Sequence, residues 1–273
     1  MPPADSPFHR LLSLPARIAN RLQAGRWLRE LRRCAAPLAP LDVSPLLVIV
    51  PHQDDESFGC GGLIALKRRC GAPVVIVYLT DGAASLLPGA VRGEDLVQRR
   101  RAEAIAAGGI LGVPRESIHF LDGPDGGLAA LDAHRKNQLV GRLAALLADL
   151  KPGQVAVTFR HDVHADHEAA YHLAEMAVRL TASAPEILEF PIWSLWHMRA
   201  ENRPWAGSAA WRRLDIRAVR ETKLRAVACF ASQLSPSLLG KRGYLPPLLV
   251  RRLTGAAEIF FVTRHPGGGP HSG

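Results

Sequence analysis

The chain has 273 residues, of which 48% are hydrophobic and 22% are charged, so it is long enough to bury a full core in one large domain or two small ones. No apolar run approaches 18 residues, so no transmembrane helix is predicted, and an aromatic content of only 6% argues against a stacking platform for single-stranded nucleic acid. The four cysteines show no CxxC spacing and are expected to be reduced thiols of a cytoplasmic protein; they are Cys34, Cys60, Cys70 and Cys229.

The net charge of +9 is confined to the two ends of the chain. Residues 1–40 hold seven Arg and two acidic residues, and residues 241–273 hold five Lys or Arg and one acidic residue. Residues 41–240 hold 22 basic and 22 acidic residues, so the body carries no net charge and binding to nucleic acid is not expected. The basic ends suit peripheral contact with an anionic membrane surface or with a protein partner, and solvated tails are the alternative.

Residues 1–40 are predicted to form a basic extension ahead of a domain at residues 41–264. Within this extension, residues 16–33 have a helical pattern whose apolar phase breaks at Gly25. A helix that lies in a membrane keeps one apolar stripe, so deep insertion is not expected. The Gly-rich end of the chain, residues 265–273, is predicted to be a flexible tail.

From residue 41 onward the pattern alternates between strands and helices. Short apolar runs predict strands at residues 46–50, 73–80, 117–121, 154–159, 186–193 and 258–263. Longer stretches between them predict helices at residues 61–69, 95–111, 132–150, 165–180 and 216–230. This alternation predicts an α/β fold of the Rossmann-like class, with a mostly parallel sheet and helices on both faces. In such sheets, ligands bind beyond the carboxyl ends of the strands.

Two clusters of His and Asp follow the first and fourth predicted strands. PHQDDE occupies residues 51–56, and RHDVHADH occupies residues 160–167. A His and an Asp from one loop with a His from the other would supply the three protein ligands of a catalytic zinc site, and the remaining carboxylate could act as a base. Helix capping is the structural alternative for each cluster taken alone. Gly59, Gly61 and Gly62 lack the lysine of a phosphate-binding loop and are expected to let a helix start close under the site.

With these residues the chain resembles the PIG-L/LmbE-like zinc-dependent de-N-acetylases. The resemblance rests on PHQDDE followed by two glycines and on HADH at residues 164–167, and by motif order it spans residues 44–230. Weaker matches support it, at Arg100-x-x-Glu103, Leu111-Gly112, Lys223 and Ser232-Gln233. Gln53 departs from the proline that the family often has there, which affects the expected rigidity of the loop more than the chemistry.

The resemblance assigns three ligands to a Zn²⁺ cofactor, and these are His52, Asp55 and His167. It also implies Asp54 as the general base, a protonated His164 facing the developing oxyanion, and Asp166 as the residue that orients or tunes His164. Arg100 is expected to bind a polar or anionic part of the substrate. The alternative for Arg100 is a surface ion pair with Glu103, one helical turn away.

The resemblance further implies a hydrolase that removes the acetyl group from an N-acetylated amino sugar, an N-acetylglucosamine conjugate that is lipid-linked for some members of the family. Water attacks the amide carbonyl, Asp54 takes its proton, and Asp54 or His164 returns a proton to the leaving amine. The alternative is a non-catalytic Rossmann-like binding module with a vestigial metal site. The pocket is expected to be lined by residues 83–94, 189–198 and 232–250. In the second segment, Trp193 and Trp196 are candidates either for stacking on a sugar or for the core.

Overall fold

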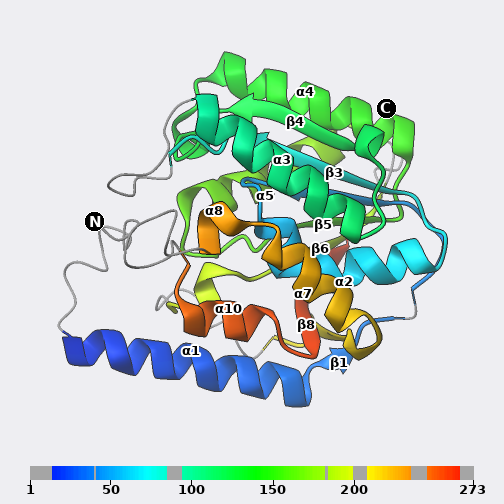
Figure 1. Ribbon diagram of the computed structural model, residues 1–273. Coiled ribbons are helices and arrows are strands. Elements are labelled where there is room, and N and C mark those ends of the chain that lie inside the picture. Colours follow the sequence, from blue (N-terminus) through cyan, green and yellow to red (C-terminus); the bar gives the residue numbers. More distant parts are fainter. Residues whose placement is uncertain are drawn as a thin grey trace, which may run out of the picture.

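The described part of the chain is built around one eight-stranded sheet (Figure 1). The structure is a computed structural model that describes residues 14–39, 41–84, 94–181, 184–198, 208–234 and 245–264. The strands are β1 (Ala36–Pro37), β2 (Leu46–Val50), β3 (Val74–Thr80), β4 (Ile118–Gly123), β5 (Gln154–Thr158), β6 (Glu186–Phe190), β7 (Trp211–Asp215) and β8 (Ala257–Arg264). Their order across the sheet is β1-β7-β8-β6-β5-β2-β3-β4. Strand β8 is antiparallel to β6 and β7, and the other pairs in this sheet are parallel.

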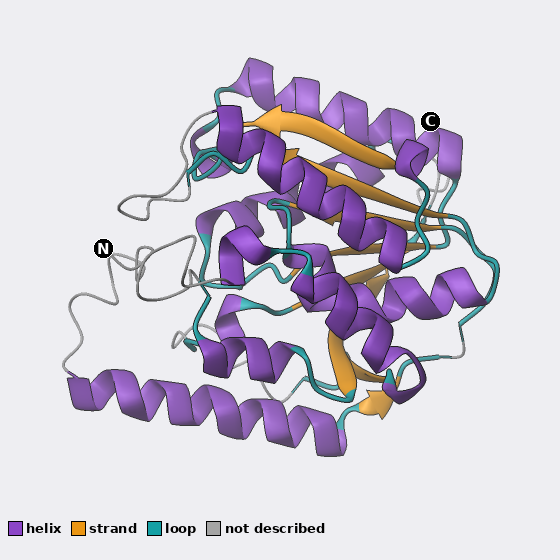
Figure 2. Ribbon diagram, in the orientation of Figure 1, coloured by secondary structure: helices purple, strands orange, loops and turns teal. Residues whose placement is uncertain are grey.

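Helices cover both faces of this sheet (Figure 2). They are α1 (Leu14–Cys34), α2 (Asp55–Arg69), α3 (Glu94–Ile110), α4 (Ala133–Leu150), α5 (Ala165–Arg179), α7 (Arg220–Ala228), α8 (Ala231–Leu234) and α10 (Pro247–Leu253). Short 3₁₀ turns lie at Arg115–Ser117, Leu128–Ala130, Trp193–Leu195 and Arg217–Val219. Helices α4 and α5 share one hydrophobic core with the sheet, while α1, α2, α3, α7 and α10 contribute to the other. The predicted Rossmann-like α/β class is therefore confirmed.

Strand β2 lies near the middle of the sheet and is buried on both faces, as its unbroken apolar sequence predicts. Successive side chains of a strand point to opposite faces. Leu47 and Ile49 accordingly join the core under α4 and α5, and the other residues of β2 join the core on the opposite face.

Strand β7 was not predicted from the sequence, and its residues explain why. Trp211 and Leu214 are buried, but Arg212 and Arg213 between them are half-buried, so the strand shows neither an apolar run nor a strict alternation. Strand β1 has two residues, too few to leave a pattern.

Helix α1 packs against the domain, in contrast to the predicted extension that precedes it. Trp27 and Leu31 are at most 5% exposed, and the ring of Trp27 meets that of Trp211 edge-on with centroids 5.3 Å apart. Strand β1, which follows α1, pairs with β7. The break in apolar phase at Gly25 marks a close approach, because a Cβ there would lie 2.6 Å from Nη2 of Arg252 in α10.

Some predictions fall on residues that the structure does not describe. These include the flexible tail at 265–273 and large parts of two predicted pocket segments, at 85–93 and 235–244. Among the described helices, none is both long enough and apolar enough to cross a membrane.

The carboxyl ends of β2 and β5 form the place where a ligand site is expected. Strand β2 pairs with β3 on one side and with β5 on the other, and β5 pairs in turn with β6, so the direction of strand order reverses between β2 and β5. Such a switch point opens a crevice at the carboxyl edge of the sheet. The two His and Asp clusters follow these two strands.

Candidate metal centre

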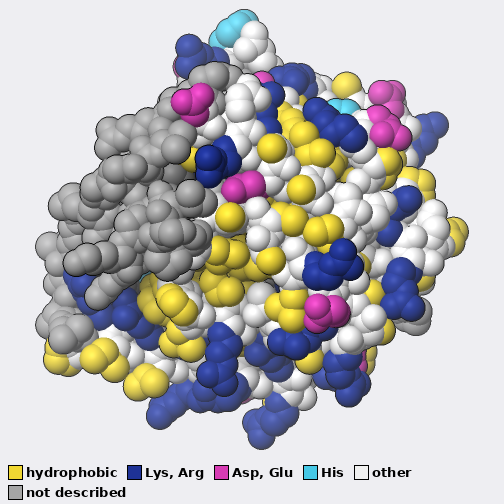
Figure 3. Space-filling view, viewed as in Figure 1, with side chains coloured by type: hydrophobic (Ala, Val, Ile, Leu, Met, Phe, Trp, Pro, Cys, Tyr) yellow, Lys and Arg dark blue, Asp and Glu magenta, His cyan; other side chains and the backbone are white. Residues whose placement is uncertain are grey.

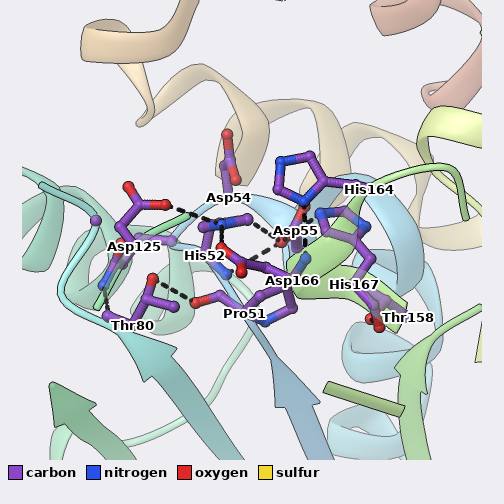
Figure 4. Close-up of polar contacts among 12 residues, drawn as sticks. Pro51, His52, Asp54, Asp55, Thr80, Asp125, Thr158, His164, Asp166 and His167 are labelled. Carbon is purple, nitrogen blue, oxygen red and sulfur yellow. Dashed lines mark hydrogen bonds and ion pairs between the residues drawn. The ribbon is translucent and has the colours of Figure 1, made fainter. Parts of the chain in front are cut away.

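Two loops at these neighbouring strand ends bring the predicted site residues together (Figure 4). The first runs from β2 to the start of α2 at Asp55, and the second runs from β5 to His164, the N-cap residue of α5. Each loop contains a strained residue. Asp54 has a φ of 145° and Val163 has a φ of 67°, values that side chains with a Cβ rarely adopt. Strain of this kind persists only where the surrounding structure enforces it, and it concentrates at functional sites.

Two of the three expected metal ligands, His52 and His167, lie close to one carboxylate oxygen of the third, Asp55. Oδ2 of Asp55 lies 3.2 Å from Nδ1 of His52 and 3.4 Å from Nε2 of His167. All three side chains are buried, and one donor atom from each lies within 4.8 Å of the others. Although burial alone favours the neutral acid, the charges of His167 and His52 lower the pKa of Asp55 to about 2. Two imidazole nitrogens and an ionised carboxylate can hold a divalent metal ion.

His167, one of the expected ligands, is oriented by its second nitrogen. Nδ1 of His167 lies 2.7 Å from Oδ2 of Asp162, and because a carboxylate only accepts, Nδ1 carries the proton. In the neutral form of this ring, Nε2 is then left with a lone pair. This buried atom has no hydrogen-bond partner among the described residues, which suits an atom that binds a metal ion.

Asp162 was not singled out from the sequence, although it stands within RHDVHADH. Besides His167, its carboxylate accepts hydrogen bonds from the backbone amides of Ile192, Trp193 and Ser194 at 2.9–3.1 Å and from the Ser194 hydroxyl at 2.8 Å. One fully buried carboxylate thus joins the ligand to the segment that follows β6. Its position five residues before His167 was the available signal.

His52 is held from the opposite side by two further carboxylates. Its Nε2 lies 3.1 Å from Oδ1 of Asp125 and 3.2 Å from Oδ2 of Asp166. Burial alone lowers the pKa of His52, but hydrogen bonds to Asp125, Asp166 and Asp55 outweigh burial and raise this pKa well above its usual value. Asp125 was missed in the sequence, because it follows β4 in an irregular segment with no neighbouring His.

The resemblance implied that Asp166 orients or tunes His164, and the structure links the two residues through the backbone of Asp166 rather than through its carboxylate. The carboxylate contacts His52 and accepts hydrogen bonds from the amides of Gly126 at 2.7 Å and Leu128 at 3.0 Å. The backbone amide of Asp166 donates instead to Nδ1 of His164 at 3.2 Å. Asp166 therefore ties His52 to the loop after β4, and its backbone orients His164.

His164 lies beside the three ligands. Its ring centre is 5.1 Å from that of His52 and 4.7 Å from that of His167. Burial, with the charges of His167 and His52, lowers the pKa of His164 to about 3, so the imidazole is neutral, in contrast to the protonated form expected. Since Nδ1 accepts from the Asp166 amide, Nε2 carries the proton and is the hydrogen-bond donor of this ring.

Asp54 is a buried carboxyl group, 6% exposed, next to the ligand Asp55. Burial and the charge of Asp55 raise the pKa of Asp54 well above its usual value, against the opposing charge of Arg100. A raised pKa makes a carboxylate a better proton acceptor near neutral pH. In Figure 4, Asp54 and His164 extend to the same side of the group formed by His52, Asp55 and His167.

Arg100 reaches the site but does not pair with Glu103. Its guanidinium donates to the carbonyls of Gln53 at 3.0 Å and Gly82 at 3.2 Å, and it lies 3.8 Å from Asp54. Glu103 instead accepts from the amide and hydroxyl of Ser232, so the surface ion pair considered as an alternative is wrong. At 4% exposure, Arg100 supports the loop that carries Asp54.

Gln53 holds the loop after β2 by a hydrogen bond, whereas a proline at this position would stiffen the loop through its ring. Its Nε2 donates to the carbonyl of Thr80 at 2.8 Å, which ties the loop to the end of β3. A Cβ at Gly82, where φ is 73°, would lie 2.3 Å from Oε1 of Gln53, so only glycine fits there. The loop is thus held by hydrogen bonds rather than by ring geometry.

The two tryptophans expected at the pocket lie in different places. Trp193 is half-buried with its ring 6.4 Å from that of His164, at the site. Trp196 carries the guanidinium of Arg21 over its ring at 4.3 Å and so faces α1. His172, a further histidine of α5, is exposed.

Comparison with known proteins shows what the chain is similar to. Residues 47–178 match the family model described as PIG-L: GlcNAc-PI de-N-acetylase. The chain is 34% identical over 140 residues to the diacetylchitobiose deacetylase of Thermococcus kodakarensis, covering 50% of each protein. It is 35% identical over 169 residues to the 1D-myo-inositol 2-acetamido-2-deoxy-alpha-D-glucopyranoside deacetylase of Mycobacterium sp. strain KMS, covering 52% of this chain and 53% of that protein. The matched region thus spans about half the length of these curated relatives.

A solved structure extends the likeness to most of the chain. The N,N'-diacetylchitobiose deacetylase from Pyrococcus horikoshii superposes with a TM-score of 0.62 at 20% identity, covering 96% of this chain and 98% of that one. At this identity the superposition shows a shared fold. This shared fold agrees with the match of residues 47–178 to the PIG-L family model and with the two His and Asp motifs.

Proposed function

We propose that the chain is a zinc-dependent hydrolase that removes the acetyl group from an N-acetylglucosamine conjugate. The observation that carries the proposal is the convergence of Nδ1 of His52 and Nε2 of His167 on Oδ2 of Asp55. Both curated relatives named above are deacetylases, and their names point to N-acetylated glucosamine units as the substrate class.

The site contains more than a metal-binding module needs, which argues against the non-catalytic alternative. Asp54 is held in a strained conformation with a raised pKa, although it is not one of the three ligands. His164 presents an Nε2–H donor without being required for the ligand set. A base and a hydrogen-bond donor beside the ligand set have a use in catalysis that a binding module does not need.

Asp54 acts as the general base in the proposed reaction. A zinc ion held by His52, Asp55 and His167 would polarise the amide carbonyl and lower the pKa of water. Asp54 accepts a proton at its carboxylate from the attacking water and later delivers that proton to the nitrogen of the departing amine. The neighbouring Arg100 holds the loop in the position that this transfer requires.

His164 stabilises the negative charge that develops on the carbonyl oxygen. Its neutral ring donates from Nε2, while the backbone amide of Asp166 holds Nδ1 in place. A preorganised donor of this kind commonly contributes a factor of about 10²–10³ in kcat. The ring of Trp193 lies beside that of His164 and offers an aromatic surface on which a sugar ring can stack.

A screen of acetate release tests the proposal. Purified protein is incubated with N-acetylglucosamine linked to lipid, inositol, thiol and glycan groups, with Asp54→Asn as the inactive control. Release of acetate by the wild type alone supports the proposal, and its rate across the conjugates identifies the group attached to the sugar. A zinc-loaded wild type that releases no acetate from any conjugate would favour the binding-module alternative.

We also propose peripheral contact with anionic membranes through α1. Figure 3 shows Lys and Arg side chains gathered along the lower edge of the molecule, over α1 and α10, with hydrophobic side chains at the left end of that edge. Ile18 and Leu22 are 48% and 59% exposed, and Arg26, Arg29 and Arg33 are exposed on the same helix. Basic side chains contribute about 1 kcal/mol each near anionic lipid. A lipid-linked substrate and a cytoplasmic location would fit this contact, and both stay predictions.

Co-sedimentation with phosphatidylglycerol and phosphatidylcholine vesicles tests the membrane contact. Binding is expected to the anionic vesicles alone and to weaken as salt is added. Because α1 packs in the core, substitution is a cleaner test than deletion: Arg26→Gln/Arg29→Gln should weaken binding roughly 30-fold. Arg135→Gln/Arg179→Gln, on α4 and α5, is the matched control and should bind as the wild type does. A wild type that ignores anionic vesicles at low salt would exclude this contact.

A further inference from the structure

Helix α2, which begins with the ligand Asp55, is interrupted after its first turn. Cys60 has φ and ψ of −138° and 20°, outside the helical region. The break divides α2 into an initial turn at residues 55–59 and a main helical part at residues 61–69. The initial turn carries the metal ligand, so its position relative to His167 depends on how the break is held.

A buried ion pair takes the place of one helical hydrogen bond at this break. In an uninterrupted α-helix the amide of Gly62 would donate to the carbonyl of Phe58. Here the Gly62 amide donates to Oε1 of Glu258 at 2.7 Å, and the Phe58 carbonyl accepts from Nζ of Lys223 at 2.8 Å. Lys223 and Glu258 are themselves joined at 2.7 Å. The Lys223–Glu258 pair therefore links the Gly62 amide to the Phe58 carbonyl across the break.

Further contacts fix both members of the pair to α2. Oε2 of Glu258 accepts from the amide of Leu63 at 2.9 Å, so the carboxylate caps the main part of the helix. A Cβ at Gly61 would touch the stem of Lys223 at 3.4 Å, and one at Gly62 would lie 2.5 Å from Ile216. Gly61 and Gly62, which were expected to let a helix start close under the site, thus allow the side chains of Lys223 and Ile216 to pack against α2.

We propose that Lys223 and Glu258 are positioning residues for the metal centre, an inference that rests on the proposed function. Both side chains are at most 1% exposed; Lys223 lies on α7 and Glu258 on β8. By holding the Phe58 carbonyl and the Gly62 amide at fixed places, the pair sets the position of the initial turn and with it Oδ2 of Asp55. Neither residue takes part in the metal coordination or in proton transfer.

Zinc affinity measured separately from stability tests this role. Lys223→Met and Glu258→Gln should each weaken zinc binding about 10–100-fold in a chelator competition, the usual effect of a residue that supports a metal ligand. Lys67→Met is the matched control, because Lys67 is a fully buried lysine of the same helix whose Nζ bonds to Asp42 and Ser44. It should lower the thermal midpoint and leave the zinc affinity of the folded protein unchanged.

The double variant separates positioning from simple stability. Lys223→Met/Glu258→Gln removes both charges, so its thermal midpoint should lie above that of Lys223→Met, which leaves a buried carboxylate unpaired. Its zinc affinity should stay low, because the bridge across the break is still missing. Wild-type affinity in the folded double variant would overturn the inference. If Lys223→Met fails to fold, Glu258→Gln, which keeps an oxygen acceptor, carries the test.

Amide hydrogen exchange keeps this inference distinct from the proposed function. Should the wild type bind no zinc, the proposed metal centre is lost, whereas the bridge is still measurable. Exchange at residues 58–63 should accelerate in Glu258→Gln relative to the wild type and stay unchanged in Lys67→Met. Unchanged exchange in Glu258→Gln would show that the pair does not hold the break.

Discussion

Oδ2 of Asp162 accepts a hydrogen bond from Nδ1 of His167 at 2.7 Å, with both side chains fully buried. The contact fixes the tautomer of the ring and directs the lone pair of Nε2 toward Asp55. We therefore expect the metal affinity of the site to depend on a residue outside the proposed ligand set.

Asp162→Asn should lower zinc affinity about 10–100-fold, the range found for residues that support metal ligands. Both carboxylate oxygens of Asp162 accept hydrogen bonds, but an asparagine has only one side-chain oxygen. Its NH₂ group would face either the Nδ1–H of His167 or the backbone amides of residues 192–194, and one of these hydrogen bonds would be lost. Chelator competition measures the change, and Asp149→Asn, an exposed acid of α4, is the control. Wild-type affinity in Asp162→Asn would show that the tautomer is set elsewhere.

Asp54→Asn and Asp55→Asn should separate the base from the ligand. Asp54→Asn is expected to keep its zinc and lose about 10²–10⁴-fold in turnover, the usual contribution of a general base. Asp55→Asn should lose zinc, because Asp55 supplies the charged ligand atom between His52 and His167. Metal content and acetate release are measured on the same preparations. The opposite metal contents would exchange the roles of the two carboxylates.

The strained backbone at Asp54 predicts an unusual order of stability. With φ at 145° and ψ at −29°, a residue with a Cβ costs about 1–3 kcal/mol here, whereas glycine, which lacks a Cβ, costs less. Asp54→Gly should therefore unfold at a higher denaturant concentration than Asp54→Ala, although both lack the base and are inactive. Equal midpoints for the two variants would mean that the native backbone carries no strain at this position.

Arg100→Ala distinguishes loop support from substrate binding. The guanidinium is 4% exposed and holds the carbonyls of Gln53 and Gly82, so the variant is expected to lower kcat more than it raises KM. The cause would be a displaced Asp54 rather than a lost substrate contact. Steady-state kinetics on one N-acetylglucosamine conjugate measure the split. A raised KM with unchanged kcat would instead support the substrate-binding role expected from the sequence.

The contact between Asp42 and Lys67 predicts a stability change in acid. Hydrogen bonds from Lys67 and Ser44 lower the pKa of the exposed Asp42 from 3.8 to about 2. A carboxyl group with a lowered pKa in the folded state stabilises that state above its unfolded pKa, and this contribution disappears as the pH falls toward 2.

The thermal midpoint of the wild type should therefore exceed that of Asp42→Asn near neutral pH, and the gap should close between about pH 4 and pH 2. Asp149→Asn, which removes an exposed acid of α4, is again the control. A constant gap for Asp42→Asn would show that its charge makes no net contribution to stability.

Most of the sheet could be predicted from the sequence, because its inner strands carry local signals. Strand β2 is an unbroken apolar run, since both of its faces are covered. Strand β7 could not be predicted, because two half-buried arginines interrupt its pattern. Helix α1 was placed outside the domain for a related reason: its apolar residues change face at Gly25, and only the fold shows that Trp27 meets Trp211.

In the site, the expected ligands come from the two motifs, whereas Asp162 within the second motif and Asp125 outside both were missed. His52, Asp55 and His167 were expected together and lie together. Asp125 lies beside His52 only because the loop after β4 folds over the end of β2. Lys223 and Glu258 are far from α2 in sequence, and neither gives a local sign of its contact with the break.

The pairing of β2 with β5 has a consequence for the order of folding. His52 and His167 are separated by 115 positions in the sequence and meet only when these two strands are in register. A loop of that length is closed late and slowly, so a nascent chain holds no local metal site that could guide its collapse. Metal capture would then follow assembly of the sheet, and the rate of zinc uptake during refolding would report the arrival of β5 beside β2.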